Sequence, residues 1–343
     1  MNTSSTINAY RRELLKMITS FLIKSQKQYA VDATRIQRVL IVRPNGRLGN
    51  QLLISPLMKE VTQTFPNARI DLFVKGGIAP ILFGNYPQTD RYITLPGRPF
   101  SHLLDYMNVW LKILGRRYDI VINAVGGSSS GRLATSLARA KYKIYDATDE
   151  DLQRRYPDYR HIAKRAVYNL RKNLFSNHPE LLDKPMPLLD IHLDKRELDN
   201  GLVLLHKMFG EEKPVICIYT FATGSKCYSK EWWKSLYDDL LHKYGNDYKI
   251  IEILPKENVS QIDFSAPTYY SRDLREMAAL MAGTKAYIGA DCGIMHLAAA
   301  AHLKTIGFFS VTDIGMYEPY GNGSRAIDTN ATPVHDIVKM LDV

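Results

Sequence analysis

The chain has 343 residues, 45% of them hydrophobic, a net charge of +10 and three cysteines. This length favours two domains, and no apolar run reaches the roughly 20 residues that a membrane-spanning helix needs. Cys217, Cys227 and Cys292 are odd in number and lack zinc-ligand spacing. This argues against a disulfide framework or a zinc finger and, with no signal peptide apparent, predicts a cytoplasmic protein.

The positive charge is concentrated in the first half of the chain. Residues 1–160 contain 24 Lys and Arg against 12 Asp and Glu, whereas the remainder contains 21 against 23. The first half is therefore expected to meet something acidic. We do not expect nucleic acid, because the chain has no helix-turn-helix cue, RNP motif or zinc finger. An acidic glycan or glycolipid acceptor at an anionic membrane surface would suit this positive charge. Alternatively, the basic residues only form a solvated surface.

The first predicted element is an amphipathic helix over residues 7–30. Tyr10, Leu14, Ile18 and Leu22 recur at four-residue spacing among Lys and Arg side chains. Such a helix lies on an anionic membrane face, or it packs on the body of the protein or on a partner subunit. Both interpretations stay open. If the helix lies on a membrane, the protein would be a peripheral membrane protein at the inner face of the cytoplasmic membrane.

Strands and helices then alternate along the chain. Helical periodicity predicts helices at residues 50–61 and 103–114, and compact apolar runs predict strands at residues 38–43, 69–74, 92–95, 119–123, 214–219, 248–254, 286–288 and 305–309. This alternation indicates an α/β protein with two Rossmann-like, doubly wound parallel sheets, whose strand ends would face one another across a cleft. The predicted parts are a helical extension (1–36), an N-terminal domain (37–175), a linker (176–194), a C-terminal domain (195–330) and a C-terminal helix (331–343).

The turn at residues 289–296 is the strongest candidate for a ligand site. A strand ends there in Gly-Ala-Asp-Cys-Gly-Ile-Met-His, and a helix of small apolar residues follows at once. Ligands of open α/β sheets bind outside the carboxyl ends of the strands, where helix N-termini attract phosphate. Asp291 and His296 would face that edge, and Gly293 would let the backbone approach a ligand closely. Alternatively, Asp291 only caps the helix.

Two further patterns suggest other chemistry. Asp149 and Asp151 match the Asp-x-Asp pattern of metal-dependent glycosyltransferases, but they lie in the charged stretch 146–155, which we interpret as a solvated loop. We therefore expect no metal site. Gly46 and Gly49 follow the first strand as in a dinucleotide loop, but the full Gly-x-Gly-x-x-Gly pattern is missing, which disfavours an NAD-dependent oxidoreductase.

The chain resembles glycosyltransferase family 9, the ADP-heptose:lipopolysaccharide heptosyltransferases and their relatives. The resemblance lies in four segments, which follow the family's order: Arg-Leu-Gly-Asn-Gln-Leu-Leu-Ile-Ser-Pro-Leu at 47–57, Ser-Lys-Glu-Trp-Trp at 229–233, the stretch 270–283, and residues 291–300 leading to 309–313. The resemblance implies a GT-B fold and an inverting, metal-independent transfer of a sugar from a nucleotide-sugar donor, with no other cofactor. It points to a heptose moved from ADP-heptose onto a lipopolysaccharide core or related glycan.

The resemblance also implies a donor site in the second domain. Lys230 matches a lysine that contacts donor phosphate, and Thr223 and Ser225 match hydroxyl positions near the diphosphate. Glu257 is the candidate acid for the nucleoside ribose. The donor-binding turn is matched at Asp291, Cys292, Gly293 and His296, with Cys292 in place of the usual Ser or Thr.

The first domain departs from the family at Asn50. Members usually have Gly-Asp there, and the aspartate is the expected general base. An amide has no useful basicity near neutral pH, so Asn50 cannot accept the proton. Either another residue is the base, or the acceptor differs, or the protein binds nucleotide sugars without catalysis. Arg47, Gly49 and Gln51 complete this loop, which is also similar to the Gly-Asn-Gln loop of some fucosyltransferases.

Overall fold

The computed structural model describes residues 28–97, 103–210 and 213–343. The helix predicted for residues 7–30 falls almost entirely outside these ranges. None of the helices in the described part of the chain combines the length and the apolar composition that crossing a bilayer requires.

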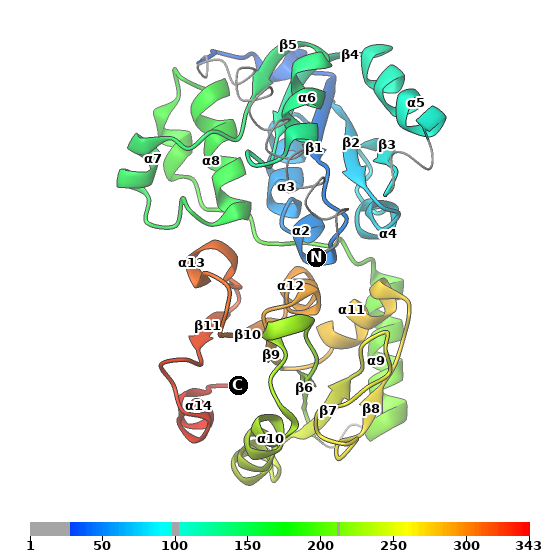
Figure 1. Cartoon of the computed structure of the whole chain (residues 1–343), viewed down its shortest axis with the longest axis vertical. Coiled ribbons are helices and arrows are strands. Elements are labelled where there is room, and N and C mark those ends of the chain that lie inside the picture. Colours follow the sequence, from blue (N-terminus) through cyan, green and yellow to red (C-terminus); the bar gives the residue numbers. More distant parts are fainter. Residues whose placement is uncertain (1–27, 98–102, 211–212) are drawn as a thin grey trace, which may run out of the picture. The chain divides into compact units, whose positions relative to one another are not determined.

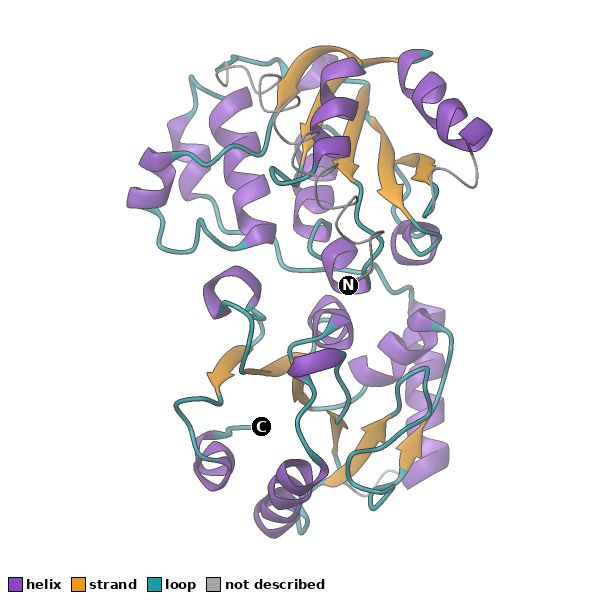
Figure 2. Ribbon diagram, in the orientation of Figure 1, coloured by secondary structure: helices purple, strands orange, loops and turns teal. Residues whose placement is uncertain are grey.

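The chain divides into two compact units, each built on its own parallel sheet (Figure 1). The second unit contains Leu188–Val343 together with Arg47–Ser55 and Ile81–Asn85 from the N-terminal third. Figure 2 shows helices alternating with the strands and lying against the sheets. The α/β character and the two Rossmann-like sheets expected from the sequence are confirmed.

The first sheet has five parallel strands in the order β3-β2-β1-β4-β5. The strands are β1 (Arg38–Arg43), β2 (Arg69–Lys75), β3 (Thr89–Leu95), β4 (Arg117–Asn123) and β5 (Arg139–Ile144). The helices that follow them in the chain are α3 (Ser55–Thr64), α4 (Ala79–Phe83), α5 (Leu103–Leu114), α6 (Ser129–Leu137), α7 (Glu150–Arg155) and α8 (Ile162–Leu174). Apolar side chains of α5 and α6 cover one face of this sheet.

The second sheet has six parallel strands in the order β11-β10-β9-β6-β7-β8. The strands are β6 (Val215–Tyr219), β7 (Lys249–Ile253), β8 (Thr268–Tyr269), β9 (Ala286–Ala290), β10 (Lys304–Phe309) and β11 (Arg325–Asp328). The helices of this unit are α2 (Leu48–Leu52), α9 (Lys195–Phe209), α10 (Lys230–Tyr244), α11 (Leu274–Ala282), α12 (Gly293–Ala300), α13 (Ile314–Tyr317) and α14 (Val334–Met340). The chain winds outward in both directions from β6 and β9, so the topological switch point lies between these two strands.

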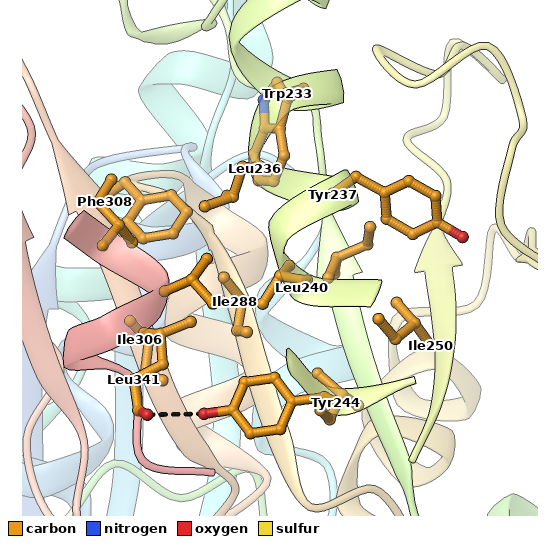
Figure 3. Packing of buried hydrophobic residues seen from close by; sticks show 14 of the residues in the cluster. Trp233, Leu236, Tyr237, Leu240, Tyr244, Ile250, Ile288, Ile306, Phe308 and Leu341 are labelled. Atoms are coloured by element: carbon orange, nitrogen blue, oxygen red, sulfur yellow. Dashed lines mark hydrogen bonds between the residues drawn. The ribbon is translucent and has the colours of Figure 1, made fainter. Parts of the chain in front are cut away.

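The core of the second unit lies between the sheet and helices α10 and α14 (Figure 3). Trp233, Leu236 and Leu240 recur at helical spacing on α10, and all three are fully buried. The Tyr244 hydroxyl donates a hydrogen bond of 2.6 Å to the Leu341 carbonyl, which ties the end of α10 to the segment after α14.

The single helix predicted over residues 50–61 is wrong in one respect, because the structure has two helices there. α2 ends at Leu52, and α3 begins at Ser55 with Pro56 in its first turn. Proline has no N–H to donate and its ring clashes with the carbonyl four residues earlier, which here is that of Leu52. The Ser55 hydroxyl donates to that carbonyl at 2.6 Å instead, and accepts a hydrogen bond from the Asp190 N–H at 3.0 Å.

Candidate functional site

Two loops meet at the switch point of the second sheet. Strands β6 and β9 are neighbours, so the loops that follow them lie at the same edge. The loop after β6 forms a short 3-10 helix, η4 (Gly224–Lys226), and Gly224 has a φ of +66°, which favours glycine. At this edge Lys226 Nζ donates to Asp291 Oδ2 at 2.5 Å. The side chain of Lys226 is 35% exposed and that of Asp291 only 6%, so a nearly buried carboxylate faces a cation within reach of solvent.

Asp291 does not cap the helix that follows it. The N-cap of α12 is Cys292, and it makes no side-chain capping hydrogen bond. The capping explanation of Asp291 is therefore wrong, and the charge of Asp291 is balanced by Lys226.

His296, in the first turn and a half of α12, completes this cluster. Its Nε2 lies 3.9 Å from Asp291 Oδ1, and its side chain is 5% exposed. Burial lowers the pKa of His296 well below its usual value; Asp291 opposes this shift and Lys226 adds to it. His296 is therefore neutral at neutral pH, and its ring can donate or accept a hydrogen bond without adding charge.

Helix α2 packs closely on α12 through two glycines. A Cβ atom on Gly49 would lie 2.7 Å from His296 Cδ2, and one on Gly293 would lie 3.0 Å from Leu48 Cβ. Both helices belong to the second unit. The two sequence motifs that contain these glycines are therefore in direct contact, and any larger residue at Gly49 would displace the imidazole of His296.

The structure places Lys230 away from Asp291. Lys230 begins α10, its side chain is 52% exposed, and its Nζ donates to Asp263 Oδ1 at 2.5 Å. The resemblance points to Lys230 for contact with donor phosphate, whereas the lysine that lies beside Asp291 is Lys226. One signal in the sequence could have identified it: Lys226 immediately follows the Gly-Ser turn after an apolar strand, which puts it at the carboxyl edge of the sheet.

The other predicted donor residues lie in two places. Thr223 and Ser225 are exposed on the loop that carries Lys226. Cys292 is half-buried; its Sγ lies 3.7 Å from the Tyr287 hydroxyl, and burial raises the pKa of its thiol. Glu257 lies on the loop after β7, with an oxygen 3.7 Å from Lys256 Nζ.

The acid on β7 itself, Glu252, is fully buried. Glu252 accepts hydrogen bonds from the Thr220 hydroxyl at 2.5 Å and from the Ser260 hydroxyl at 2.7 Å, and burial raises its pKa. The Ser260 hydroxyl also accepts from the Phe264 N–H. Glu252 therefore holds the loop that contains Glu257 against the sheet.

Asn50 is the third residue of α2 and is half-buried. The N-cap of that helix is Arg47, so Asn50 is not a helix cap. Gln51 is fully buried, whereas Arg47 is exposed. Along this segment Arg47 is thus exposed and Asn50 half-buried, while Gly49 and Gln51 are buried.

Residues 146–155 are largely solvated, as expected, with Asp151 and Arg154 74% and 77% exposed, but the expected loop contains the helix α7. Asp149 is the N-cap of α7: its carboxylate accepts from the Leu152 N–H at 3.0 Å and from Lys172 Nζ at 2.6 and 2.7 Å. Asp146 is buried and pairs with Arg165 at 2.6 Å. Within residues 28–97, 103–210 and 213–343, no group of three His, Cys, Asp or Glu side chains is arranged to hold a metal ion.

Comparisons with known proteins agree with this architecture. The profile of glycosyltransferase family 9 (heptosyltransferase) matches residues 107–341. Lipopolysaccharide heptosyltransferase 1 of Salmonella typhimurium is 27% identical over 312 residues, which cover 84% of this chain and 93% of that protein.

Solved structures show the same fold. A family 9 glycosyl transferase from Veillonella parvula superimposes with a TM-score of 0.67 at 16% identity, over 92% of each chain. An E. coli heptosyltransferase with ADP superimposes with a TM-score of 0.63 at 20% identity, over 88% of this chain and 98% of that one. The protein therefore has the GT-B fold, is a glycosyltransferase and belongs to glycosyltransferase family 9.

Proposed function

We propose that the protein transfers a heptose from ADP-heptose onto a lipopolysaccharide core or a related acidic glycan, with inversion at the anomeric carbon and without a metal ion. The cluster of Lys226, Asp291 and His296 at the switch point of the second sheet carries this proposal. The name of its Salmonella relative, lipopolysaccharide heptosyltransferase 1, supports the choice of sugar and acceptor.

The donor diphosphate would bind where Lys226 faces the start of α12. The first amides of a helix have no partner within the helix, and the helix dipole favours negative charge there. Lys226 would exchange its hydrogen bond with Asp291 for one with a phosphate oxygen, and Thr223 and Ser225 lie on the same loop. A lysine beside a helix N-terminus can stabilise a departing diphosphate, which is the task that a metal ion performs in other transferases.

Asp291 would then hold the sugar. Once Lys226 turns to phosphate, the nearly buried Asp291 carboxylate needs other hydrogen-bond donors, and sugar hydroxyls are suitable ones. Neutral His296 can hydrogen-bond to a hydroxyl or a phosphate without adding charge. Glu257, on the loop that Glu252 fixes, remains the candidate for the ribose.

The acceptor would be activated by a residue other than Asn50. The amide of Asn50 can orient an acceptor hydroxyl by hydrogen bonds, but it cannot remove its proton. The N-terminal domain would bind the acceptor, because the excess of positive charge in residues 1–160 suits an acidic glycan. A cytoplasmic position at the inner membrane face fits such an acceptor.

The two lysines provide a matched test of the donor site. We expect Lys226→Ala to weaken ADP binding more than tenfold, because losing a charged hydrogen bond costs about 1.5–3 kcal/mol. Lys230→Ala should bind ADP like the wild type, since Lys230 pairs with Asp263 at an exposed position. Isothermal calorimetry measures both affinities, and thermal melting checks that each variant is folded.

Binding and activity assays test the rest of the proposal. In a thermal-shift assay, ADP-heptose should raise the melting temperature more than other nucleotide sugars do. In an activity assay, turnover should survive an excess of EDTA. Unchanged ADP affinity in Lys226→Ala would refute the donor site. Donor binding without any transfer would identify a catalytically silent protein, and a strict requirement for Mg²⁺ would refute the metal-independent mechanism.

A further inference from the structure

Helix α5 has two apolar faces, and only one of them is buried. Val109 and Ile113 pack into the core of the first unit, with Trp110 partly buried beside them. On the outer side an apolar stripe is open to solvent. The side chains of this stripe, with their exposed fractions, are Leu104 (82%), Met107 (54%), Leu111 (62%) and Leu114 (37%).

The spacing of these four residues places them on one side of the helix. Steps of three, four and three residues follow the helical repeat, so the side chains form a continuous stripe along α5. The helix lies at the outer edge of its unit in Figures 1 and 2 and contacts β3 and α6. Contiguous exposed apolar side chains of this kind mark interaction surfaces more often than scattered single ones do.

A basic hollow lies beside the stripe. Its volume is about 360 Å³, and it is lined by Arg91, Tyr92 and Ile93 of β3 and by Lys112 of α5. Among the described residues, this lining contains two cations and no acidic side chain. The acidic side chain on α5 is Asp105, which is exposed and lies on the same polar side of the helix as Lys112.

The neighbouring Arg116 does not add free positive charge. Its guanidinium pairs with Asp71 at 3.1 Å and with Asp90 at 2.6 Å, and its side chain is only 12% exposed. The cations that line the hollow are therefore Arg91 and Lys112, of which Arg91 also interacts electrostatically with Asp90 and Asp71.

We propose that α5 and this hollow form a docking face for an anionic lipid bilayer. The stripe would enter the boundary between headgroups and acyl chains, and the hollow would hold a lipid phosphate between Arg91 and Lys112. A helix binds at a membrane interface through this combination of an apolar face and bordering cations. The positive charge of the hollow favours an anionic lipid surface over a second copy of this chain, whose first half is itself basic.

This docking face is separate from the donor site. It lies on the first unit, whereas Lys226 and Asp291 lie on the second. The proposal rests on α5 and β3 alone, so it holds whichever sugar the protein transfers. Its test needs no turnover.

Vesicle sedimentation of the full-length protein tests the stripe. The wild type should bind vesicles of phosphatidylethanolamine with phosphatidylglycerol and should bind vesicles of phosphatidylcholine weakly. The double variant Leu104→Ser with Leu111→Ser should bind the anionic vesicles at least tenfold more weakly. This is the order of effect expected when two apolar side chains are no longer transferred from water into the bilayer. The matched control is Leu202→Ser with Val203→Ser, which changes two exposed apolar residues of α9 and should leave binding unchanged.

A charge variant tests the hollow. Arg91→Gln with Lys112→Gln should weaken binding to the anionic vesicles about fivefold for each cation lost, and added salt should narrow the difference. Circular dichroism melting confirms that all variants are folded. Equal binding by the wild type and the stripe variant would overturn the proposal, as would equal binding of the wild type to both kinds of vesicle. A wild-type dimer that the stripe variant converts to a monomer would assign this face to a second copy instead.

Discussion

Replacing Gly49 by alanine should change the stability of the protein in a direction that depends on His296. The added Cβ would lie 2.7 Å from His296 Cδ2, which is closer than such atoms approach one another, and the ring is buried and cannot swing away freely. Overpacking a core in this way costs about 1–3 kcal/mol. Alanine in place of glycine within a helix recovers about 1 kcal/mol. The net expectation for Gly49→Ala is a loss of up to about 2 kcal/mol.

The change in stability caused by Gly49→Ala should reverse its sign when His296 is also replaced. In a His296→Ala background the ring is gone, so the clash disappears and Gly49→Ala should stabilise the protein by about 0.5–1 kcal/mol. Chemical denaturation of the wild type, both single variants and the double variant gives a coupling energy of about 1–3 kcal/mol.

Gly127→Ala is the control, because a Cβ on Gly127 meets no atom within 4 Å. It should change stability by less than about 0.5 kcal/mol. If Gly49→Ala has the same effect in both backgrounds, α2 and α12 do not pack through this glycine and the proposed link between the two motifs fails.

Three other predictions concern single residues. Asn50→Asp should change turnover clearly while ADP affinity stays near the wild-type value, and Asn50→Ala should lower turnover; wild-type rates in both would remove Asn50 from the active site. Arg171→Ala should lower the free energy of unfolding by about 3–5 kcal/mol, because it leaves Glu60 buried without its bidentate partner, whereas Arg154→Ala, at an exposed ion pair, should cost less than about 1 kcal/mol; equal losses would contradict this account. Because the pKa of His296 is lowered in the folded protein, the unfolded state binds a proton at this residue more readily. The free energy of unfolding should therefore fall as the pH drops below about 6.5, and it should fall less in His296→Gln. Denaturation curves at several pH values measure both.

The strands that the sequence predicted are those with continuous apolar runs. β1, β6 and β10 are buried along almost their whole length, as strands covered on both faces must be. β5 was not predicted, because it lies at the edge of the first sheet and alternates charged side chains, Arg139, Lys141 and Lys143, with smaller or partly buried ones. Hydrophobic periodicity therefore predicts central strands better than edge strands.

The candidate site was predicted only in part for a similar reason. The turn at Asp291 has a local signature, since a strand, small residues and a helix follow one another directly. The choice between Lys226 and Lys230 depends on where the loop after β6 runs, and spacing along the sequence does not determine that path. The ion pair of Asp149 could not be predicted from local spacing either, because its partner Lys172 is 23 residues away on another helix.

The membership of α2 in the second unit has a consequence for the order of folding. Residues 47–55 leave the ribosome long before α12, so the face of α2 that contains Gly49 has no partner until most of the chain has been made. Closing this contact orders a long intervening stretch, and such non-local pairing is slow. A fragment that begins at Leu188 would lack α2, and Gly293 on α12 would meet water. A single cut at residue 188 therefore cannot yield an intact second unit.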